Sequence, residues 1–348
     1  MPATFFIFQA LFFSLIAILV VAQISVWLSW RTKLIDFPGS APHKQHTRPT
    51  PLAGGVALAI TLLLCEWLFG TYKDLNVRAT FIAGLPIFIF GLWDDYKNIP
   101  PLMKILGQVI AAVILIHLGI YIRVFESPGF FIRGAGGIYT YLDWLITILW
   151  VVGITNAFNF VDSMDGLAIG LGGMAAAFFM LVTLDAQQPT LSLHSAFIIG
   201  VCTGLYFYNS PPARLFLGDS GAQSLGFILA VLGIGYNPQG VYGASSWFTP
   251  IMLLAVPIFD TVLIVISRVR RKLPISSARL DHTYHRLLHL GLESNRAVLV
   301  MQMVAFSLSC LAFVLLDQPP LIANSIFAVV LLLGGAILVF LDSPRLWV

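Results

Sequence analysis

Charged side chains are scarce in this sequence. Only 10% of its 348 residues are Asp, Glu, Lys or Arg, whereas 58% are hydrophobic. A soluble domain carries roughly 25% charged residues, so this composition excludes an ordinary soluble protein. The chain also lacks a polar stretch long enough to fold by itself. We therefore expect one membrane-embedded domain over residues 1–348.

Cysteine is scarce as well. The three cysteines, Cys65, Cys202 and Cys310, all lie in apolar runs and show neither CxxC nor Cys/His spacing. This pattern argues against a disulfide framework or a zinc site. We interpret them as small apolar residues of the core or of the lipid-facing surface.

Long apolar runs are abundant. A transmembrane helix needs about 20 mainly apolar residues, and such runs recur along the whole chain. The sequence therefore predicts an all-α polytopic integral membrane protein with about eleven transmembrane helices. The predicted spans are residues 4–30, 52–70, 79–93, 105–122, 141–158, 167–184, 191–208, 221–236, 248–267, 295–316 and 320–341.

The basic residues predict the orientation of these spans. No basic residue precedes the first span, whereas Arg31 and Lys33 follow it directly. Because Lys and Arg gather in cytoplasmic loops, we place the N-terminus outside and the C-terminus in the cytoplasm. With that parity, fifteen of the 19 basic residues fall on the cytoplasmic side.

A polar segment, NAFNFVDSMDGL at residues 156–167, interrupts the apolar pattern. Asn156, Asn159, Asp162 and Asp165 recur there at every third position. They all share one face only if the turn tightens toward a 3₁₀-helix. Carboxylate and amide oxygens suit a hard cation together with a sugar or phosphate ligand. The alternative is helix capping, because Asn and Asp favour helix starts and Asp-Gly favours turns.

Two other acidic motifs lie at the ends of predicted spans. Asp94 and Asp95 are adjacent, so on a helix they point about 100° apart, and one can face a site while the other contacts a neighbouring group. Asp219, in the segment LFLGDSG, opens a later span. A carboxylate beside free backbone N–H groups suits a metal bound to phosphate. For each of these motifs, a helix cap is the alternative interpretation.

Histidines mark two cytoplasmic loops. His282 and His285 lie three residues apart beside Arg286 and are suited to gripping a diphosphate or orienting a carboxylate. Asp260, within the ninth predicted span, is expected to be buried and paired or to line a polar cleft. In the first inside loop, His46 belongs to a basic segment. One interpretation is that this segment binds a phosphate, and the alternative is that it is an ordinary basic loop on the cytoplasmic side.

Under the predicted orientation, the acidic motifs and the histidine pair all face the cytoplasm. The loops that carry them are far apart in sequence but share acidic, metal-friendly chemistry. We therefore predict one active site at the cytoplasmic face.

Five motifs together resemble the polyprenyl-phosphate N-acetylhexosamine-1-phosphate transferase family, which includes a muramoyl-pentapeptide branch. They are HTRPTPLAGG, GLWDDYKNIPPLMK, NAFNFVDSMDGL, LFLGDSG and DHTYHRLLHLGL, within residues 46–292. The resemblance implies that a sugar-1-phosphate passes from a UDP-sugar to undecaprenyl phosphate in the bacterial inner membrane, releasing UMP and starting a cell-envelope glycan. UDP-GlcNAc is the expected donor, because Thr283 and Tyr284 separate the two histidines and so alter the family's histidine box.

The resemblance also implies roles for individual residues. It places Asp219 and Asn159 at Mg²⁺, with Mn²⁺ as the alternative ion. It assigns catalysis to Asp94, Asp95, Asp162, Asp165, His282 and His285. It assigns substrate binding to Lys104, Asn156, Asn98, Arg286 and His46.

The expected partners are undecaprenyl phosphate, a UDP-N-acetylhexosamine and membrane lipids, with no nucleic acid; a homodimer stays open. Two alternatives to this function remain. One is phospho-MurNAc-pentapeptide transfer in peptidoglycan synthesis. The other is an ion-coupled transporter, but such sites usually lie at mid-bilayer in paired repeats. Here the acidic residues cluster at one face, and no repeat is evident.

Overall fold

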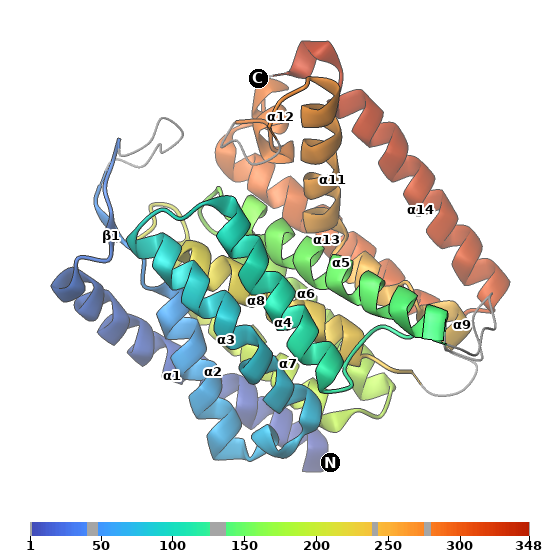
Figure 1. The fold of residues 1–348 in the computed structure, drawn as a ribbon, viewed down its shortest axis with the longest axis horizontal. Coiled ribbons are helices and arrows are strands. Elements are labelled where there is room, and N and C mark those ends of the chain that lie inside the picture. Colours follow the sequence, from blue (N-terminus) through green and yellow to red (C-terminus); the bar gives the residue numbers. More distant parts are fainter. Residues whose placement is uncertain (1, 40–47, 126–136, 239–242, 275–279, 348) are drawn as a thin grey trace.

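The apolar segments fold almost entirely into helices. A computed structural model describes residues 2–39, 48–125, 137–238, 243–274 and 280–347. Outside the helices, the described residues contain one short antiparallel sheet, in which β1 (Ile35–Asp36) pairs with β2 (Thr50–Pro51). Figure 1 shows the resulting bundle. The α-helices are α1 (Pro2–Thr32), α2 (Gly54–Phe69), α3 (Leu75–Tyr96), α4 (Pro101–His117), α5 (Gly137–Val161), α6 (Leu167–Asp185), α7 (Pro189–Asn209), α8 (Gly218–Gly235), α9 (Gly243–Ser246), α10 (Thr249–Leu253), α11 (Ala255–Arg270), α12 (Thr283–His289), α13 (Ser294–Val314) and α14 (Pro320–Leu341).

Helices occupy all eleven segments that the sequence predicted as spans. Within the described residues, seven helices are long and apolar enough to cross a membrane, namely α1, α3, α5, α6, α7, α13 and α14, whereas α2 and α4 are shorter apolar helices. The chain is therefore an all-α, multi-pass membrane protein.

The ninth predicted segment differs from a single helix, because it is divided into α10 and α11 around Leu254. Proline at position 257 explains the break. It lacks the N–H that would bond to the carbonyl of Leu253, so the helical ladder is interrupted there.

Helix α8 forms the centre of the bundle. Every residue from Ser220 to Leu232 is buried, and the helix packs against α2, α3 and α5. Glycine permits the close approach of α3, because a Cβ on Gly91 would lie 2.6 Å from the Cα of Ser220. The C-terminal end of α3 is thereby held against the N-terminal turn of α8, where two of the acidic motifs lie.

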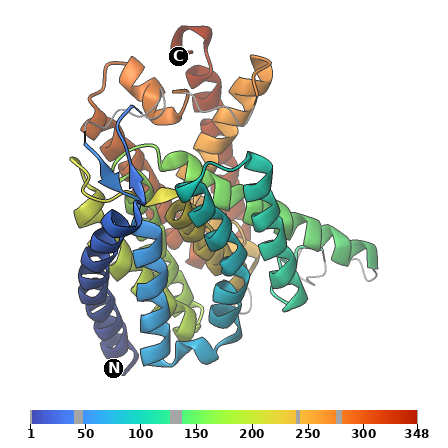
Figure 2. The same cartoon turned by 60° about the vertical axis from the view of Figure 1, so that its left-hand side comes forward.

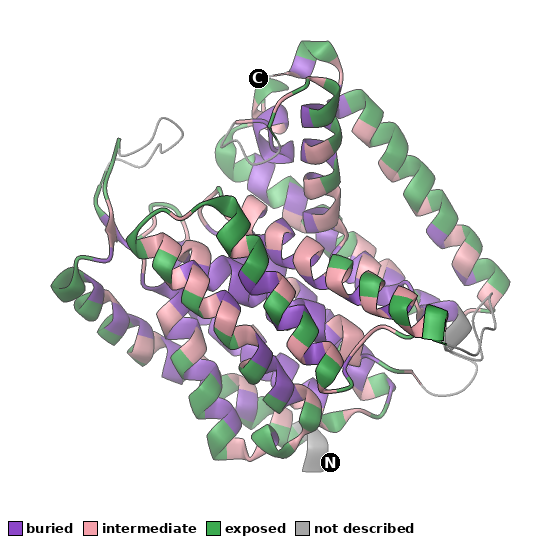
Figure 3. Ribbon diagram, viewed as in Figure 1, coloured by how far each residue is buried: buried purple, intermediate pink, exposed green. Residues whose placement is uncertain are grey.

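The outer helices expose their apolar side chains. On α14, Leu321 is 81% exposed and Leu332 is 74% exposed, and Figure 3 shows exposed residues along most of this helix. Such a surface suits contact with lipid chains rather than water. Figures 1 and 2 both place the two termini at opposite ends of the molecule, with α1 and α2 side by side.

Candidate active site at the helix ends

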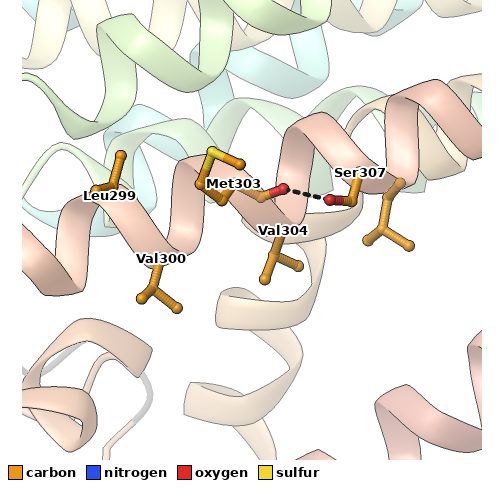
Figure 4. A pocket seen from close by; sticks show the side chains of 6 residues that line it. Leu299, Val300, Met303, Val304 and Ser307 are labelled. Atoms are coloured by element: carbon orange, nitrogen blue, oxygen red, sulfur yellow. Dashed lines mark hydrogen bonds between the residues drawn. The ribbon is translucent and has the colours of Figure 1, made fainter.

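An open apolar groove of about 400 Å³ runs along the outer side of α13. Figure 4 shows its lining, in which the hydroxyl of Ser307 donates to the carbonyl of Met303 within the same helix. The lining residues are Leu299, Val300, Met303, Val304, Ser307 and Leu308. None of them is ionisable, so this groove offers no acid, base or metal ligand. Ionisable side chains gather instead where several helices of the bundle end.

Lys104 joins two acidic motifs that are far apart in sequence. Its Nζ lies 3.2 Å from Oδ2 of Asp94 and 2.6 Å from Oδ2 of Asp219. Asp94 comes from the last turns of α3, Lys104 from the first turn of α4 and Asp219 from the first turn of α8. All three side chains are partly exposed. A ligand can therefore reach a lysine that two carboxylates already hold in place.

Asp95 points to a different partner, as its adjacent position predicted. Its carboxylate accepts hydrogen bonds from the backbone N–H of Asp219 at 2.7 Å, from the N–H of Ser220 at 3.1 Å and from the Ser220 hydroxyl at 2.6 Å. An anion at a helix N-terminus is favoured by the free N–H groups and by the helix dipole. A Cβ on Gly218, whose φ is +71°, would lie 2.8 Å from both carboxylate oxygens. Asp95 thus caps α8 from another helix.

Amide side chains extend this arrangement into the bundle. The side chain of Asn159 lies near the carboxylate of Asp219. Asn156 and Gln108 exchange hydrogen bonds of 3.3 Å and 2.6 Å. Gln108 also donates to Gln223 at 3.0 Å, and Gln223 donates to Asp219 at 3.2 Å. Neither glutamine was predicted as a site residue, although an amide within an apolar run is a recognisable signal.

The segment after α5 carries two more carboxylates, and one of them, Asp162, lies near Asp219 and Asp95. Burial, and then the negative charges of neighbouring carboxylates with Asp219 first, raises the pKa of Asp162 well above its usual value. Asp165 accepts a hydrogen bond from the backbone N–H of Ala213 at 3.2 Å. We call Asp94, Asp95, Asp162 and Asp219, together with Lys104, the acidic cluster.

Residues 280–290, the histidine loop, adjoin the end of α5. The ring of His282 lies edge-on to Phe160, with 6.2 Å between the centroids, and its Nδ1 lies 3.0 Å from Oδ2 of Asp260. Oδ1 of Asp260 accepts from the backbone N–H of Thr283 at 2.6 Å. Asp260 is therefore buried and paired, which was one of the two expectations for it. The histidine loop thus contacts the segment that carries Asn159 and Asp162, through Phe160 and through the carbonyl of Ser163.

Arg268 and Arg286 form hydrogen bonds with the histidine loop and with the C-terminal segment. Arg268 makes two bonds, of 3.0 Å and 2.7 Å, to the carboxylate of Asp281. Arg286 is fully buried and donates to the carbonyls of Asp281 and Leu341 and, at 3.4 Å, to Asp342. It ties the histidine loop to the C-terminal segment, and its role in substrate binding stays a prediction.

Comparison with known proteins identifies the family. Residues 77–237 match the sequence model described as "Glycosyl transferase family 4". A probable undecaprenyl-phosphate N-acetylglucosaminyl 1-phosphate transferase of Bacillus subtilis (strain 168) is 31% identical over 305 residues, which cover 87% of this chain and 83% of that protein. The chain belongs to glycosyl transferase family 4.

Other relatives fall into two groups. A decaprenyl-phosphate N-acetylglucosaminephosphotransferase of Mycolicibacterium smegmatis is 34% identical, over 74% of this chain and 69% of that protein. A phospho-N-acetylmuramoyl-pentapeptide-transferase of Lactiplantibacillus plantarum is 30% identical, over 53% of this chain and 61% of that protein. The matched family segment contains the whole acidic cluster and ends before the histidine loop.

The predicted site residue Asn98 does not belong to the acidic cluster. Asn98 is exposed in the turn between α3 and α4. That turn is held by Asp94, whose Oδ1 accepts from the N–H of Ile99 at 2.8 Å. His46 lies outside the described residues. The roles of both remain predictions.

The acidic cluster has the donor chemistry of a magnesium site. In the part of the chain that the structure describes, no three His, Cys, Asp or Glu side chains form a preformed metal cage. Mg²⁺ is, however, commonly held by one or two carboxylates while water and substrate phosphates complete its shell. Asp219 and Asn159, whose side chains lie near each other, offer hard oxygen ligands of this kind. The residues present therefore fit Mg²⁺ bound together with a phosphate-bearing substrate.

Proposed function

We propose that this protein transfers GlcNAc-1-phosphate from UDP-GlcNAc to undecaprenyl phosphate, giving undecaprenyl-diphosphate-GlcNAc and UMP. The observation that carries the proposal is the position of Lys104 between Asp94 and Asp219, at helix ends that a ligand can reach. The name of the Bacillus subtilis relative supports the choice of sugar and lipid.

The reaction joins two anions. An oxygen of the lipid phosphate bonds to the phosphorus that carries the sugar, and the bond from that phosphorus to the bridging oxygen of UMP breaks. A phosphate monoester has a second pKa of about 6, so the lipid phosphate is already largely ionised at neutral pH. A strong general base is not required. Positioning and charge neutralisation are therefore the larger contributions.

Different residues of the acidic cluster contribute to positioning and to charge neutralisation. Lys104 offers its ammonium to a phosphate oxygen while Asp94 and Asp219 hold it in place. The carboxylate of Asp94 or Asp95 is the candidate to remove a residual proton from the lipid phosphate. Asp219 and Asn159 would hold Mg²⁺ or Mn²⁺, which supplies charge neutralisation for the diphosphate and for the leaving UMP. Asp95 keeps the first turn of α8 in position for these contacts.

We further propose eleven membrane spans, an external N-terminus, a cytoplasmic C-terminus and a site at the cytoplasmic face of the bacterial inner membrane. The C-terminal ends of α3 and α5 meet the N-terminal ends of α4 and α8 at the acidic cluster. Spans that alternate in direction bring such ends to one face. The opposite positions of the two termini support an odd number of spans.

The test is release of UMP by the purified protein in detergent with undecaprenyl phosphate and Mg²⁺. UDP-GlcNAc, UDP-GalNAc, UDP-glucose and UDP-MurNAc-pentapeptide are offered separately, and EDTA is the control. We expect UMP from UDP-GlcNAc only, and only with lipid and metal present. UMP from the pentapeptide donor would assign the muramoyl branch instead, and no UMP from any donor would overturn the proposal.

A further inference from the structure

His285, the second histidine of the loop, has a hydrogen-bond partner for only one of its two ring nitrogens among the described residues. His285 is buried in α12, and its Nε2 lies 2.7 Å from the hydroxyl of Tyr284. The same hydroxyl lies 3.2 Å from the backbone carbonyl of Ser163. Nδ1 of His285 is buried and has no hydrogen-bond partner among the described residues. Such an atom is costly unless a ligand or water satisfies it.

A proton count assigns the tautomer. The carbonyl of Ser163 can only accept, and the hydroxyl of Tyr284 has one proton. Both contacts are therefore hydrogen bonds only if Tyr284 donates to Ser163 and accepts from a protonated Nε2 of His285. A neutral imidazole carries a single N–H, so Nδ1 is left as an acceptor.

The ring is also uncharged. Burial, and then the charge of His282, lowers the pKa of His285 to about 4. A neutral acceptor does not attract the oxygens of a diphosphate, because these also accept hydrogen bonds. The matching group on a nucleotide sugar is a donor, which is a hydroxyl, the acetamido N–H or the uracil imide N–H.

We propose that Tyr284 is a positioning residue that fixes His285 as a hydrogen-bond acceptor, and that Nδ1 of His285 binds an O–H or N–H group of the sugar nucleotide. This inference rests on the proposed function, because it names a contact to the donor substrate. It differs from the expectation that His285 grips a diphosphate, because the partner is a hydrogen-bond donor. The bond to Ser163 also ties this contact to the segment that carries Asp162 and Asp165.

Kinetics with three variants test the contact. Tyr284→Phe keeps the aromatic ring, whose centroid lies 3.9 Å from that of His285, and removes only the hydroxyl. His285→Asn places an amide near the position of Nδ1, whereas His285→Gln places it near Nε2. We expect Tyr284→Phe and His285→Gln to raise KM for UDP-GlcNAc roughly 3- to 10-fold with little change in kcat. His285→Asn should stay closer to the wild type.

His289→Gln is the matched control, because His289 is exposed on the same helix. Its KM should not change. An unchanged KM in Tyr284→Phe, or equal effects of the Asn and Gln substitutions at position 285, would overturn the contact. A fall in folded yield alone would not produce the expected difference between KM and kcat.

Imidazole ¹⁵N shifts of the purified wild-type protein test the tautomer without any reaction. His285→Gln identifies the signals of His285, and we expect a protonated Nε2 and an unprotonated Nδ1. A protonated Nδ1 would overturn the inference even if UMP release is normal. No UMP release by the wild type would overturn the proposed function alone, since a ligand titration still tests the contact.

In that titration, the Nδ1 signal should move when the nucleotide sugar binds. A shift that UDP without a sugar already produces assigns the donor group to the nucleoside. A shift with UDP-glucose and UDP-GlcNAc but not UDP assigns it to a sugar hydroxyl, and a shift with UDP-GlcNAc alone assigns it to the acetamido N–H. No shift with any of the three would overturn the proposal.

Discussion

The acidic cluster and the histidine loop carry charge in opposite ways. The acidic cluster contains four carboxylates and one ammonium group, that of Lys104, which pairs with two of the carboxylates. In and around the histidine loop, the charges are matched within the protein. The pairs are Asp260 with His282, Arg268 with Asp281, and Arg286 with Asp342.

This difference in charge balance indicates that the acidic cluster binds a ligand, whereas the histidine loop has a structural role. An excess of negative charge at partly exposed helix ends is favourable only when a cation joins it. Buried pairs that already satisfy each other gain little from a further ion, and losing one partner leaves an uncompensated charge. The acidic cluster therefore has the character of an ion-binding site. The histidine loop has the character of a rigid support that presents a few selected polar atoms.

The largest effect is expected from removing charge at the acidic cluster. Asp219→Asn keeps the size of the side chain but removes a candidate metal ligand and a partner of Lys104. We expect kcat for UMP release to fall about 10³-fold, while the melting temperature is maintained. Asp317→Asn is the control, because Asp317 is exposed and far along the chain in a 3₁₀ turn. Normal UMP release by Asp219→Asn would remove the metal assignment.

Some of this arrangement was predictable from the sequence. The span count and the basic residues together predicted that Asp94, Asp95 and Asp219 would meet at one face, because alternate span ends share a side. Local spacing also predicted that the two adjacent aspartates would have different partners. These inferences need only helix geometry and the direction of each span.

Other contacts depend on packing and could not be predicted. Gln108 and Gln223 lie in apolar runs, and nothing in their spacing identifies the partner of either amide. The family resemblance assigned Arg286 to substrate binding. Its guanidinium turns to Asp342, 56 residues away, because the end of α14 packs beside the histidine loop. The sequence alone does not show that Arg286 and Asp342 lie close together in the folded protein.

The next largest effect is expected from removing a buried carboxylate that holds the histidine loop against the C-terminal segment. Asp342 is fully buried and interacts with Arg270 and Arg286. Asp342→Asn would leave both guanidinium groups without their carboxylate. We expect a loss of about 3 kcal/mol in the free energy of unfolding, measured in detergent. kcat per folded molecule should change far less than in Asp219→Asn.

Arg345→Gln is the matched control, because Arg345 is exposed in the same C-terminal segment. Its unfolding midpoint should equal that of the wild type. Equal stability of Asp342→Asn and the wild type would show that the buried pairs do not support the loop. The contrast between the two regions would then rest on the acidic cluster alone.

The smallest effect is a gain in stability within the acidic cluster. Because burial and nearby carboxylates raise the pKa of Asp162 in the folded protein, the folded state binds its proton more tightly than the unfolded state does. The resulting stabilisation is full below the unfolded pKa and is lost as pH rises through the folded pKa. Asp162→Asn should therefore raise the melting temperature by roughly 2–4 °C at about pH 7.5 and leave it unchanged near pH 4. A gain of equal size at both pH values would point to packing rather than charge. A loss at pH 7.5 would mean that the ionised carboxylate is already compensated, and the acidic cluster would then resemble the histidine loop.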